Sequence, residues 1–471
     1  MNGIKHFVAA VLCVLLLMST IAGCSGKDEE FMAETYGSQG DKWYFGFGKR
    51  QIVPDESSDE PLYIAGYNNA LTITGVLDLC EARAVWVDTG SKGVLIIGID
   101  CVALDHGTVT QIRDGLKDIP NCAAIHVYAT HTHAGPDTLG LWGQIGVNGK
   151  NSAYMQRLIM AAQEAGREAA QSRQPGQLYY GKVKTEKMFR DSRDPQVYDE
   201  NLYQLRFAGE NGSGLRMFFY GAHAESLRGS NRLLSRDFPG LLCDGVTEAT
   251  GDQTMFLSSA AGGLIMTKEF VGNIALNAQL NLQITGDKLI EYALSITPES
   301  ECQLQPSLKQ SRVEFTVPLD NPVFLLYKSL GILNHQAVKA DGATGYGVTS
   351  ELSVVMLGDV AVAMIPGEPF PELVQGGSYG DTNPGGVNPT PLQQIAQEMG
   401  VETLLTVGLC NDELGYIVPP SDFMVNPEKP YLERIKDQYG EDHYEETNSV
   451  GPQCAGKVAE AFRSALAALA E

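Results

Sequence analysis

Two histidines separated by one residue stand where an apolar stretch ends. His131 and His133 lie in the segment Thr-His-Thr-His-Ala-Gly-Pro, directly after the apolar run 123–129. In an extended chain alternate side chains share a face, so both imidazoles can point into one cavity. Zinc favours imidazole nitrogen, and the break into Gly-Pro leaves space for further ligands. Two histidines that only form hydrogen bonds would show the same pattern, so the motif alone leaves a metal pair and a structural pair open.

Three further residues follow apolar stretches elsewhere in the chain. His223 follows Phe-Phe-Tyr-Gly-Ala, Glu368 follows Met-Ile-Pro-Gly, and Tyr416 follows Glu-Leu-Gly. Taken singly, His223 is more typical of a core histidine, Glu368 of a helix cap or solvated group, and Tyr416 of a packing aromatic. Their shared position at strand ends favours function, because strand ends on one edge of a sheet form the crevice in which α/β proteins bind ligands.

The elements that must position these residues are strands mixed with helices. Apolar or alternating runs predict strands at 82–87, 94–99, 123–129, 202–207, 214–220, 353–357 and 360–365, and helical spacing predicts helices at 108–117, 154–172 and 456–470. This mixture predicts an α/β fold with mixed β-sheets flanked by helices. No Pro-rich or low-complexity linker interrupts residues 41–471, so we expect one large domain there.

The first residues have the pattern of an export signal. Lys5 precedes the apolar run 7–18, and Ile-Ala-Gly-Cys ends at Cys24. The run is shorter than the roughly 20 residues of a membrane-spanning helix, and small residues before a cysteine form a lipobox. The sequence predicts a signal peptide at 1–23, lipidation of Cys24 and a flexible tether at 24–40. We therefore expect export and anchoring to the outer face of a bacterial cell membrane, with ordinary secretion as the alternative.

The charge of the chain excludes one class of partner. The formal net charge is −23 at pH 7. Nucleic-acid binding needs a basic footprint to neutralise phosphates, so no nucleic-acid partner is expected. Solubility accounts for the acidity. The expected partner is the membrane surface, reached through lipidated Cys24.

The order and spacing of several segments resemble the catalytic domain of neutral and alkaline ceramidases, zinc amidases that split the N-acyl bond of ceramide. The resemblance runs from about Phe45 to the C-terminus and is carried by segments 47–54, 130–136, 231–237, 366–368, 408–416 and 444–452. It implies one Zn²⁺ bound by His131, His223, Glu368 and Tyr416, and a small-molecule or lipid amide substrate. It also implies that His133 contacts the substrate or the developing oxyanion.

The resemblance further implies an active-site arginine and a serine nucleophile. Arg190 is the position assigned to the arginine, and Arg193 lies close enough in sequence to compete with it. The family carries its serine in Gly-Asp-Val-Ser-Pro, and the matching stretch here has Gly263 for the aspartate and Ile265 for the serine. Neither can attack a carbonyl. Ser259 would lie about 20 Å away along an extended strand, too far to replace the serine.

Three hypotheses remain for a chain without that serine. In the first, zinc lowers the pKa of its water from about 15.7 towards 7, and a zinc-bound hydroxide attacks an amide or ester while His133 and Arg190 stabilise the oxyanion. In the second, the chain is a catalytically inactive surface lipoprotein of the same fold that binds a lipid or glycan. In the third, Ser226, which closely follows His223 in the chain, is the nucleophile.

Overall fold

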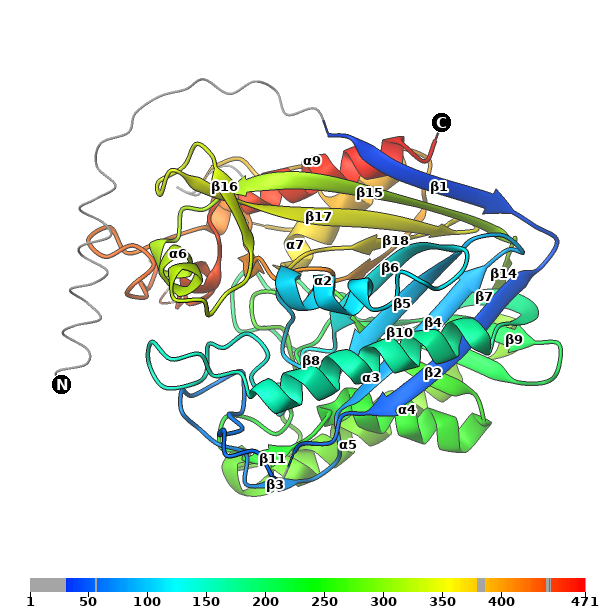
Figure 1. The fold of residues 1–471 in the computed structure, drawn as a ribbon, viewed down its shortest axis with the longest axis horizontal. Coiled ribbons are helices and arrows are strands. Elements are labelled where there is room, and N and C mark those ends of the chain that lie inside the picture. The colour runs from blue at the N-terminus through cyan, green and yellow to red at the C-terminus, as the bar shows by residue number, and fades with distance from the viewer. Residues whose placement is uncertain (1–30, 56, 379–385, 438–439, 441, 471) are drawn as a thin grey trace.

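The structure is a computed structural model, and it describes residues 31–55, 57–378, 386–437, 440 and 442–470 (Figure 1). The predicted signal peptide and Cys24 lie outside the described residues. Within the described residues, two large β-sheets face each other, with helices on their outer faces. The predicted α/β fold with mixed sheets and flanking helices is confirmed.

The larger sheet has nine strands in the described part of the chain and mixes parallel with antiparallel pairs. The parallel pairs need crossovers, and α2 (His106–Asp114) and α4 (Asp237–Thr250) provide them. The strand order is β12 (Gln253–Ser258), β10 (Gly214–Tyr220), β9 (Asn201–Gly209), β7 (Gln174–Lys184), β2 (Trp43–Gln51), β4 (Glu81–Asp88), β5 (Gly93–Ile99) and β6 (Cys122–Ala129), with β14 (Cys302–Leu304) paired to β7.

The smaller sheet has six strands among the described residues. Its order is β1 (Ala33–Gln39), β15 (Ser307–Pro318), β17 (Tyr346–Leu357), β18 (Val360–Met364) and β20 (Thr403–Val407), with β16 (Gln336–Lys339) also paired to β17. β17 and β18 form a hairpin that contains the strands predicted at 353–357 and 360–365, and Gly358 in its turn has a φ of 63°, which glycine adopts without strain.

Helices cover both outer faces, giving four layers. α9 (Cys454–Ala467) packs on β15 and β17, and α3 (Ser152–Gln171) packs on β2, β4 and β5 (Figure 1). α5 (Ile274–Ser295) packs on α4. The core between the sheets contains side chains from both, including Val85 and Phe207 of the larger sheet and Val355 and Leu405 of the smaller one. The remaining helices are α6 (Pro322–Ser329), α7 (Pro371–Gln375), α8 (Leu392–Glu398), η1 (Pro298–Ser300), η2 (Pro420–Asp422) and η3 (Glu445–Asn448).

Among the described residues, three short strand pairs lie outside the large sheets, and the last of them carries Glu368 and Tyr416. They are β3 (Gly75–Val76) with β11 (Leu233–Leu234), β8 (Phe189–Arg190) with β13 (Met266–Thr267), and β19 (Glu368–Pro369) with β21 (Tyr416–Ile417).

The flexible tether predicted at 24–40 is wrong for its second half. Residues Ala33–Gln39 form β1, which pairs antiparallel with β15 from Ala33 opposite Val313 to Gln39 opposite Ser307. An edge strand derives its order from backbone hydrogen bonds to its neighbour and keeps its other edge in solvent. A polar composition is therefore compatible with a strand at this position. In the described part of the chain, no helix is both long and apolar enough to cross a bilayer.

Candidate metal centre

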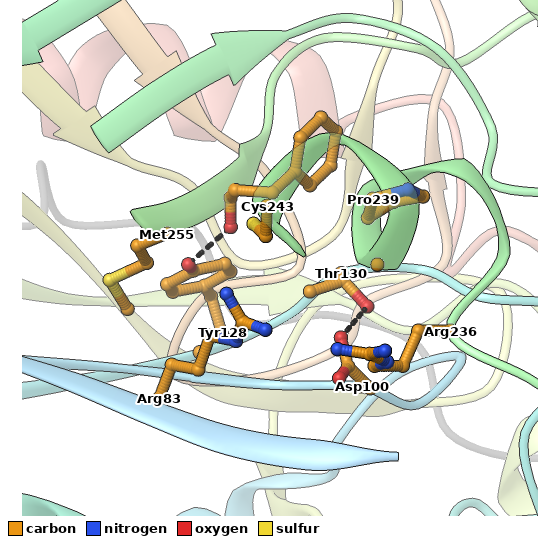
Figure 2. Close-up of a pocket in the computed structure, with 11 residues that line it drawn as sticks. Arg83, Asp100, Tyr128, Thr130, Arg236, Pro239, Cys243 and Met255 are labelled. Atoms are coloured by element: carbon orange, nitrogen blue, oxygen red, sulfur yellow. Dashed lines mark hydrogen bonds between the residues drawn. The ribbon is translucent and has the colours of Figure 1, made fainter. Parts of the chain in front are cut away.

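His131 follows β6 directly and is held in an unusual backbone conformation. Its φ is 66°, in the left-handed region that costs a non-glycine residue about 1–3 kcal/mol. Thr130 fixes the strand end, because its Oγ1 donates to Asp100 Oδ1 at 3.0 Å and its backbone N–H donates to the Ile99 carbonyl at 3.0 Å (Figure 2). The His131 Nδ1 lies 2.7 Å from the Val102 carbonyl oxygen. That acceptor places the proton on Nδ1, so Nε2 presents a lone pair.

A network of charged side chains lies beside the strand end, around a small cavity (Figure 2). Arg83 and Arg236 both pair with Glu81 and Asp244, with the closest contacts at 2.6 Å. Burial raises the pKa of Asp100 to about 6. Because both guanidiniums have carboxylate partners, this network is structural support for the end of β6.

His223 follows β10 and is oriented by the segment that should have carried the serine. Its backbone N–H donates to the Ile265 carbonyl at 2.8 Å, and its Nδ1 lies 3.1 Å from the same oxygen. The proton is again placed on Nδ1, and Nε2 points at Glu368 Oε2 at 3.2 Å. Burial is the largest single influence and opposes a charge on this ring, but the hydrogen bond to Glu368, the charges of Glu368 and Glu225 and the Ile265 carbonyl together raise the pKa of His223.

Glu368 and Tyr416 are brought together by a short parallel strand pair. They occupy the same register position of β19 and β21. Glu368 Oε2 lies 3.2 Å from Nε2 of His131 and also 3.2 Å from Nε2 of His223. Burial acts to raise the pKa of Glu368, but the two histidines lower it well below its usual range. The Tyr416 ring stacks on His223 with 6.5 Å between ring centroids, and burial raises the pKa of its phenol.

His133 completes a cluster of three imidazoles. Its Nε2 lies 3.3 Å from Nε2 of His131, and the ligand atoms of His131, His133 and His223 all lie within 4.8 Å of one another. Burial, together with the neighbouring histidines, lowers the pKa of His133 well below its ordinary value. The ring is therefore neutral near pH 7. All three histidines are buried.

The proton positions show that the donor set fits a cation. His131 and His223 each have the proton on Nδ1, so two imidazole lone pairs face one carboxylate oxygen of Glu368 at 3.2 Å. Three acceptors at that separation repel one another unless a proton or a cation lies between them. Imidazole nitrogen with carboxylate oxygen is a ligand set that suits zinc. The structure therefore brings His131, His223 and Glu368 together as predicted, with Tyr416 beside them.

Neither predicted arginine contacts this cluster in the described structure. Arg190 of β8 has a side chain that is 52% exposed, and its ion pair is with Glu269 at 3.3 Å. Arg193 is buried, but Asp422, Glu445 and Glu446 surround its guanidinium at 2.8–2.9 Å.

Sequence reasoning missed a third arginine that lies nearer. Arg228 adds positive charge that lowers the pKa of His133, although burial is the larger cause. Its Nη1 lies 3.2 Å from Glu225 Oε1 and its Nη2 lies 3.5 Å from Glu269 Oε1, whereas its buried Nε has no hydrogen-bond partner among the described residues. A left-handed φ of 61° at Arg228 turns the chain back towards the cluster. No sequence pattern marks that turn.

Glu225 and Tyr67 were also missed, and they flank His133. The Tyr67 hydroxyl donates a short hydrogen bond to Glu225 Oε2, and that oxygen lies 3.7 Å from His133 Nδ1. The Tyr67 ring meets the His133 ring edge-on, with 5.3 Å between ring centroids. The His133 Nδ1 is buried without a hydrogen-bond partner among the described residues, so the ring is constrained by packing against Tyr67.

No serine replaces the missing nucleophile in the described structure. Ile265 is 1% exposed and packs in the apolar cluster behind His223. The Ser259 hydroxyl donates to the Thr406 carbonyl at 2.8 Å, and the buried Ser226 hydroxyl lies 3.4 Å from the Thr267 hydroxyl. Neither serine is among the residues that line the cavity at the cluster.

The cluster opens into a cavity lined by residues from several elements. One part of its wall is polar and contains His131, His133, Glu368, Glu413 and Tyr416. The rest is mainly apolar, and its large side chains are Leu139, Leu141, Trp142, Phe324 and Leu333.

The fold and the site thus define a two-sheet α/β protein with three buried imidazoles and a carboxylate at one cavity. The sequence matches no protein-family model, and no curated protein matches it. Solved structures do match. Neutral ceramidase from Pseudomonas aeruginosa superposes with a TM-score of 0.69 and 15% identity, covering 91% of this chain and 74% of that one. A structure described as ceramidase complexed with C2 gives a TM-score of 0.67 and 16% identity, covering 91% and 75%. The chain therefore has the neutral ceramidase fold.

Proposed function

We propose that this chain is a zinc-dependent hydrolase of amide (N-acyl) or ester bonds that resembles neutral ceramidase. One observation carries the proposal: the lone pairs of His131 and His223 converge with a Glu368 oxygen at 3.2 Å in a buried cavity. The ligands would be His131, His223, Glu368 and Tyr416. When bound there, zinc would polarise a substrate carbonyl and lower the pKa of water, which removes the need for a serine nucleophile.

The chain's own residues supply positioning and a dry environment. His133 lies beside the proposed ligands and packs against Tyr67, so its Nε2 can hydrogen-bond the oxygen on which negative charge develops. Arg228 adds positive charge on the same side as His133. The apolar part of the cavity would hold an acyl chain and exclude water from the reacting carbonyl.

We also propose the membrane as the place of action. The lipobox cysteine Cys24 supports this, because a diacylglyceryl group on it would hold the domain at the outer face of the cell membrane. Labelling cells with a radioactive fatty acid tests the anchor. The label should be incorporated into the natural chain and lost in Cys24→Ser, and a labelled Cys24→Ser chain would refute the anchor.

Metal content and hydrolysis, measured together, test the enzyme proposal. The purified protein should carry about one zinc per chain, and it should hydrolyse N-acyl or activated ester substrates. His131→Ala with His223→Ala should lose both properties. His106→Gln, at a histidine that does not line the cavity, is the matched control and should keep both. Hydrolysis that persists in a zinc-free preparation would refute the proposal.

The buried Ile265 and the absence of a serine from the cavity wall favour a second candidate function. The chain would then be a catalytically inactive surface lipoprotein that binds a lipid or glycan. A panel of activated esters and N-acyl amines separates the two candidates. A zinc hydrolase should turn over at least one substrate, whereas a binding protein should retain ligands unchanged.

A further inference from the structure

Arg193 does not reach the metal centre, and a group of acidic side chains surrounds it instead. It follows β8 and is 5% exposed. Its Nη1 lies 2.9 Å from Glu445 Oε2, and its Nη2 lies 2.9 Å from Asp422 Oδ2 and 2.8 Å from Glu446 Oε1. The same Nη2 lies 2.9 Å from His443 Nδ1. One buried guanidinium therefore contacts four side chains from a distant part of the sequence.

These four side chains belong to one segment, residues 422–437, 440 and 442–446 of the described chain, which we call the strap. Within the described chain, their side chains form no hydrogen bond or ion pair with any residue outside the strap except Arg193. Directly after the strap, Asn321 fixes the chain by donating to the Thr447 carbonyl at 3.1 Å and to the Ser449 carbonyl at 3.0 Å. Arg193 is therefore the polar anchor of these four residues.

The strap also contributes to the wall of the cavity at the metal centre. Tyr444 lines that cavity and directly precedes Glu445 in the chain. The Tyr444 ring meets the Tyr416 ring edge-on, with 6.2 Å between ring centroids. The Arg193 guanidinium lies 5.3 Å from the centre of the Phe370 ring, and the Phe370 ring also meets the Tyr416 ring. Anchoring by Arg193 therefore determines where Tyr444 stands beside Tyr416.

The surroundings of Arg193 hold more acids than one guanidinium can neutralise. Glu372 of α7 is buried, and Asp437 of the strap lies 4.0 Å from His443 Nε2 with its side chain 8% exposed. Asp191 accepts from the Arg193 backbone N–H at 3.0 Å. If all the acids were ionised, several negative charges would be buried against one guanidinium, and burial disfavours unpaired charge.

Protons can relieve this excess at acidic pH. Burial raises the pKa of Asp422 to about 6, that of Glu445 to about 7 and that of Glu372 to about 8. A carboxyl with a raised folded pKa stabilises the closed strap fully below its unfolded pKa of about 4, and that contribution is lost as pH rises through the folded pKa. The closed strap is therefore expected to weaken between about pH 6 and about pH 8.

One ion pair of the group persists across this range. Burial opposes a charge on Glu446, but the hydrogen bond from His443 and the charge of Arg193 lower the pKa of Glu446 below its ordinary value. Arg434 of the strap lies over the Tyr444 ring at 4.4 Å and pairs with Asp442 at 3.7 Å, so its contacts lie outside the group. The Arg193–Glu446 pair thus remains while the neighbouring acids ionise.

We propose that Arg193 and the acids around it form a pH-dependent latch, which holds the strap closed at acidic pH and releases it as the acids ionise. Release would move Tyr444 away from Tyr416 and open that part of the cavity wall. This inference goes beyond the proposed hydrolase and does not depend on it, because the state of the strap can be measured without zinc or substrate.

Hydrogen exchange of the full chain, measured by mass spectrometry at pH 5.5 and pH 8.5 and corrected for the intrinsic pH dependence of exchange, tests the latch. The reporter amides are those of Met424, which donates to Glu446 Oε1 at 3.2 Å, and of His443, which donates to the Ile435 carbonyl at 2.9 Å. Their protection should fall at least tenfold between the two pH values, whereas the amides of β5 should keep theirs.

Two kinds of variant separate the guanidinium from the acids. Glu372→Gln combined with Glu445→Gln removes two titrating groups and keeps an oxygen at each position, so strap protection should change less than about threefold across the same range. Arg193→Met should lower strap protection at least tenfold at pH 5.5, and Arg193→Lys should give an intermediate value. Glu301→Gln, at a buried carboxylate paired with Arg206 of β9, is the matched control and should behave as the natural chain.

Four outcomes would overturn the latch. Strap protection in the natural chain that is the same at both pH values would do so, and this measurement needs no variant to fold. An equal fall in the natural chain and in the double glutamine variant would assign the pH effect to other groups. A parallel loss of protection in β5 would mean that the whole domain loosens. Tenfold recovery of strap protection at pH 8.5 on addition of Ca²⁺ would mean that the acids bind a cation rather than form a proton-controlled latch.

Discussion

At the scale of single residues, the nitrogen that carries the proton in each imidazole determines which nitrogen is free to bind a metal. Two backbone carbonyls, of Val102 and Ile265, take the Nδ1 protons of His131 and His223. The outward Nε2 atoms are left as acceptors around Glu368. The segment around Ile265 thus contributes to the site, because the Ile265 carbonyl orients the His223 ring.

A substitution at Glu368 should weaken metal binding much more than it weakens the fold. Glu368→Gln replaces the anionic ligand with a neutral amide of the same shape, so we expect zinc affinity to fall by more than about a hundredfold. Competition with a chromophoric chelator measures that affinity. An unchanged zinc affinity would remove Glu368 from the ligand set.

Kinetics can distinguish which of two arginines stabilises the oxyanion in the proposed reaction. Arg228 adds positive charge beside His133, and its buried Nε has no partner among the described residues, so Arg228→Ala should lower kcat/KM by about 10²-fold. Arg190 is half exposed, so Arg190→Ala should change kcat/KM by less than about threefold. The reverse ranking would restore Arg190 as the active-site arginine.

At the scale of elements, short strands place ligands that lie far apart in sequence. Glu368 and Tyr416 meet because β19 and β21 run in parallel at matching register. Gly367, the residue before Glu368, has a φ of 141°, and a Cβ there would lie 2.6 Å from the Gly415 carbonyl oxygen. The close approach of these two strands therefore depends on a residue without a side chain.

Gly367→Ala should separate the two strands. We expect a loss of about 1–3 kcal/mol in the free energy of unfolding and weaker zinc binding, because Glu368 and Tyr416 would no longer share a register. Gly272→Ala is the matched control, since a Cβ there meets no atom within 4 Å. Urea unfolding measures the stability of both variants, and zinc titration measures their zinc affinity. Equal stability and equal zinc affinity of the two variants would contradict this account.

Much of the element pattern could be predicted, and the reasons for the failures are physical. Buried strands such as β5 and β18 are continuous apolar runs, so composition alone located them. β1 was missed because an edge strand needs no apolar face. Arg228 and Glu225 were missed because they reach His133 through a loop turn that leaves no periodic signal in the sequence.

At the scale of the whole molecule, buried carboxyl groups make the stability of the fold depend on pH. Burial raises the pKa of Glu372 to about 8 and that of Glu445 to about 7. Both side chains are buried. A carboxyl whose folded pKa is raised stabilises the fold fully below its unfolded pKa near 4.5, and that contribution is lost as pH rises through the folded pKa.

Glu372→Gln should remove one part of this pH dependence. The natural chain is expected to lose up to about 4 kcal/mol of stability from Glu372 between pH 5 and pH 9. The variant should therefore gain stability relative to the natural chain as pH rises, with most of the gain complete by pH 9. Urea unfolding of both proteins at pH 5, 7 and 9 measures the difference. A difference that stays constant with pH would show that Glu372 does not titrate in this range.

The central claim is that one zinc ion joins residues from four distant parts of the chain. The most direct test is a crystal structure of the purified protein with diffraction data collected on both sides of the zinc absorption edge. The account predicts one anomalous peak about 2.0–2.2 Å from His131 Nε2, His223 Nε2 and a Glu368 oxygen, with the Tyr416 oxygen in the same shell. A well-ordered site without that peak, in protein purified and crystallised with added zinc, would contradict it.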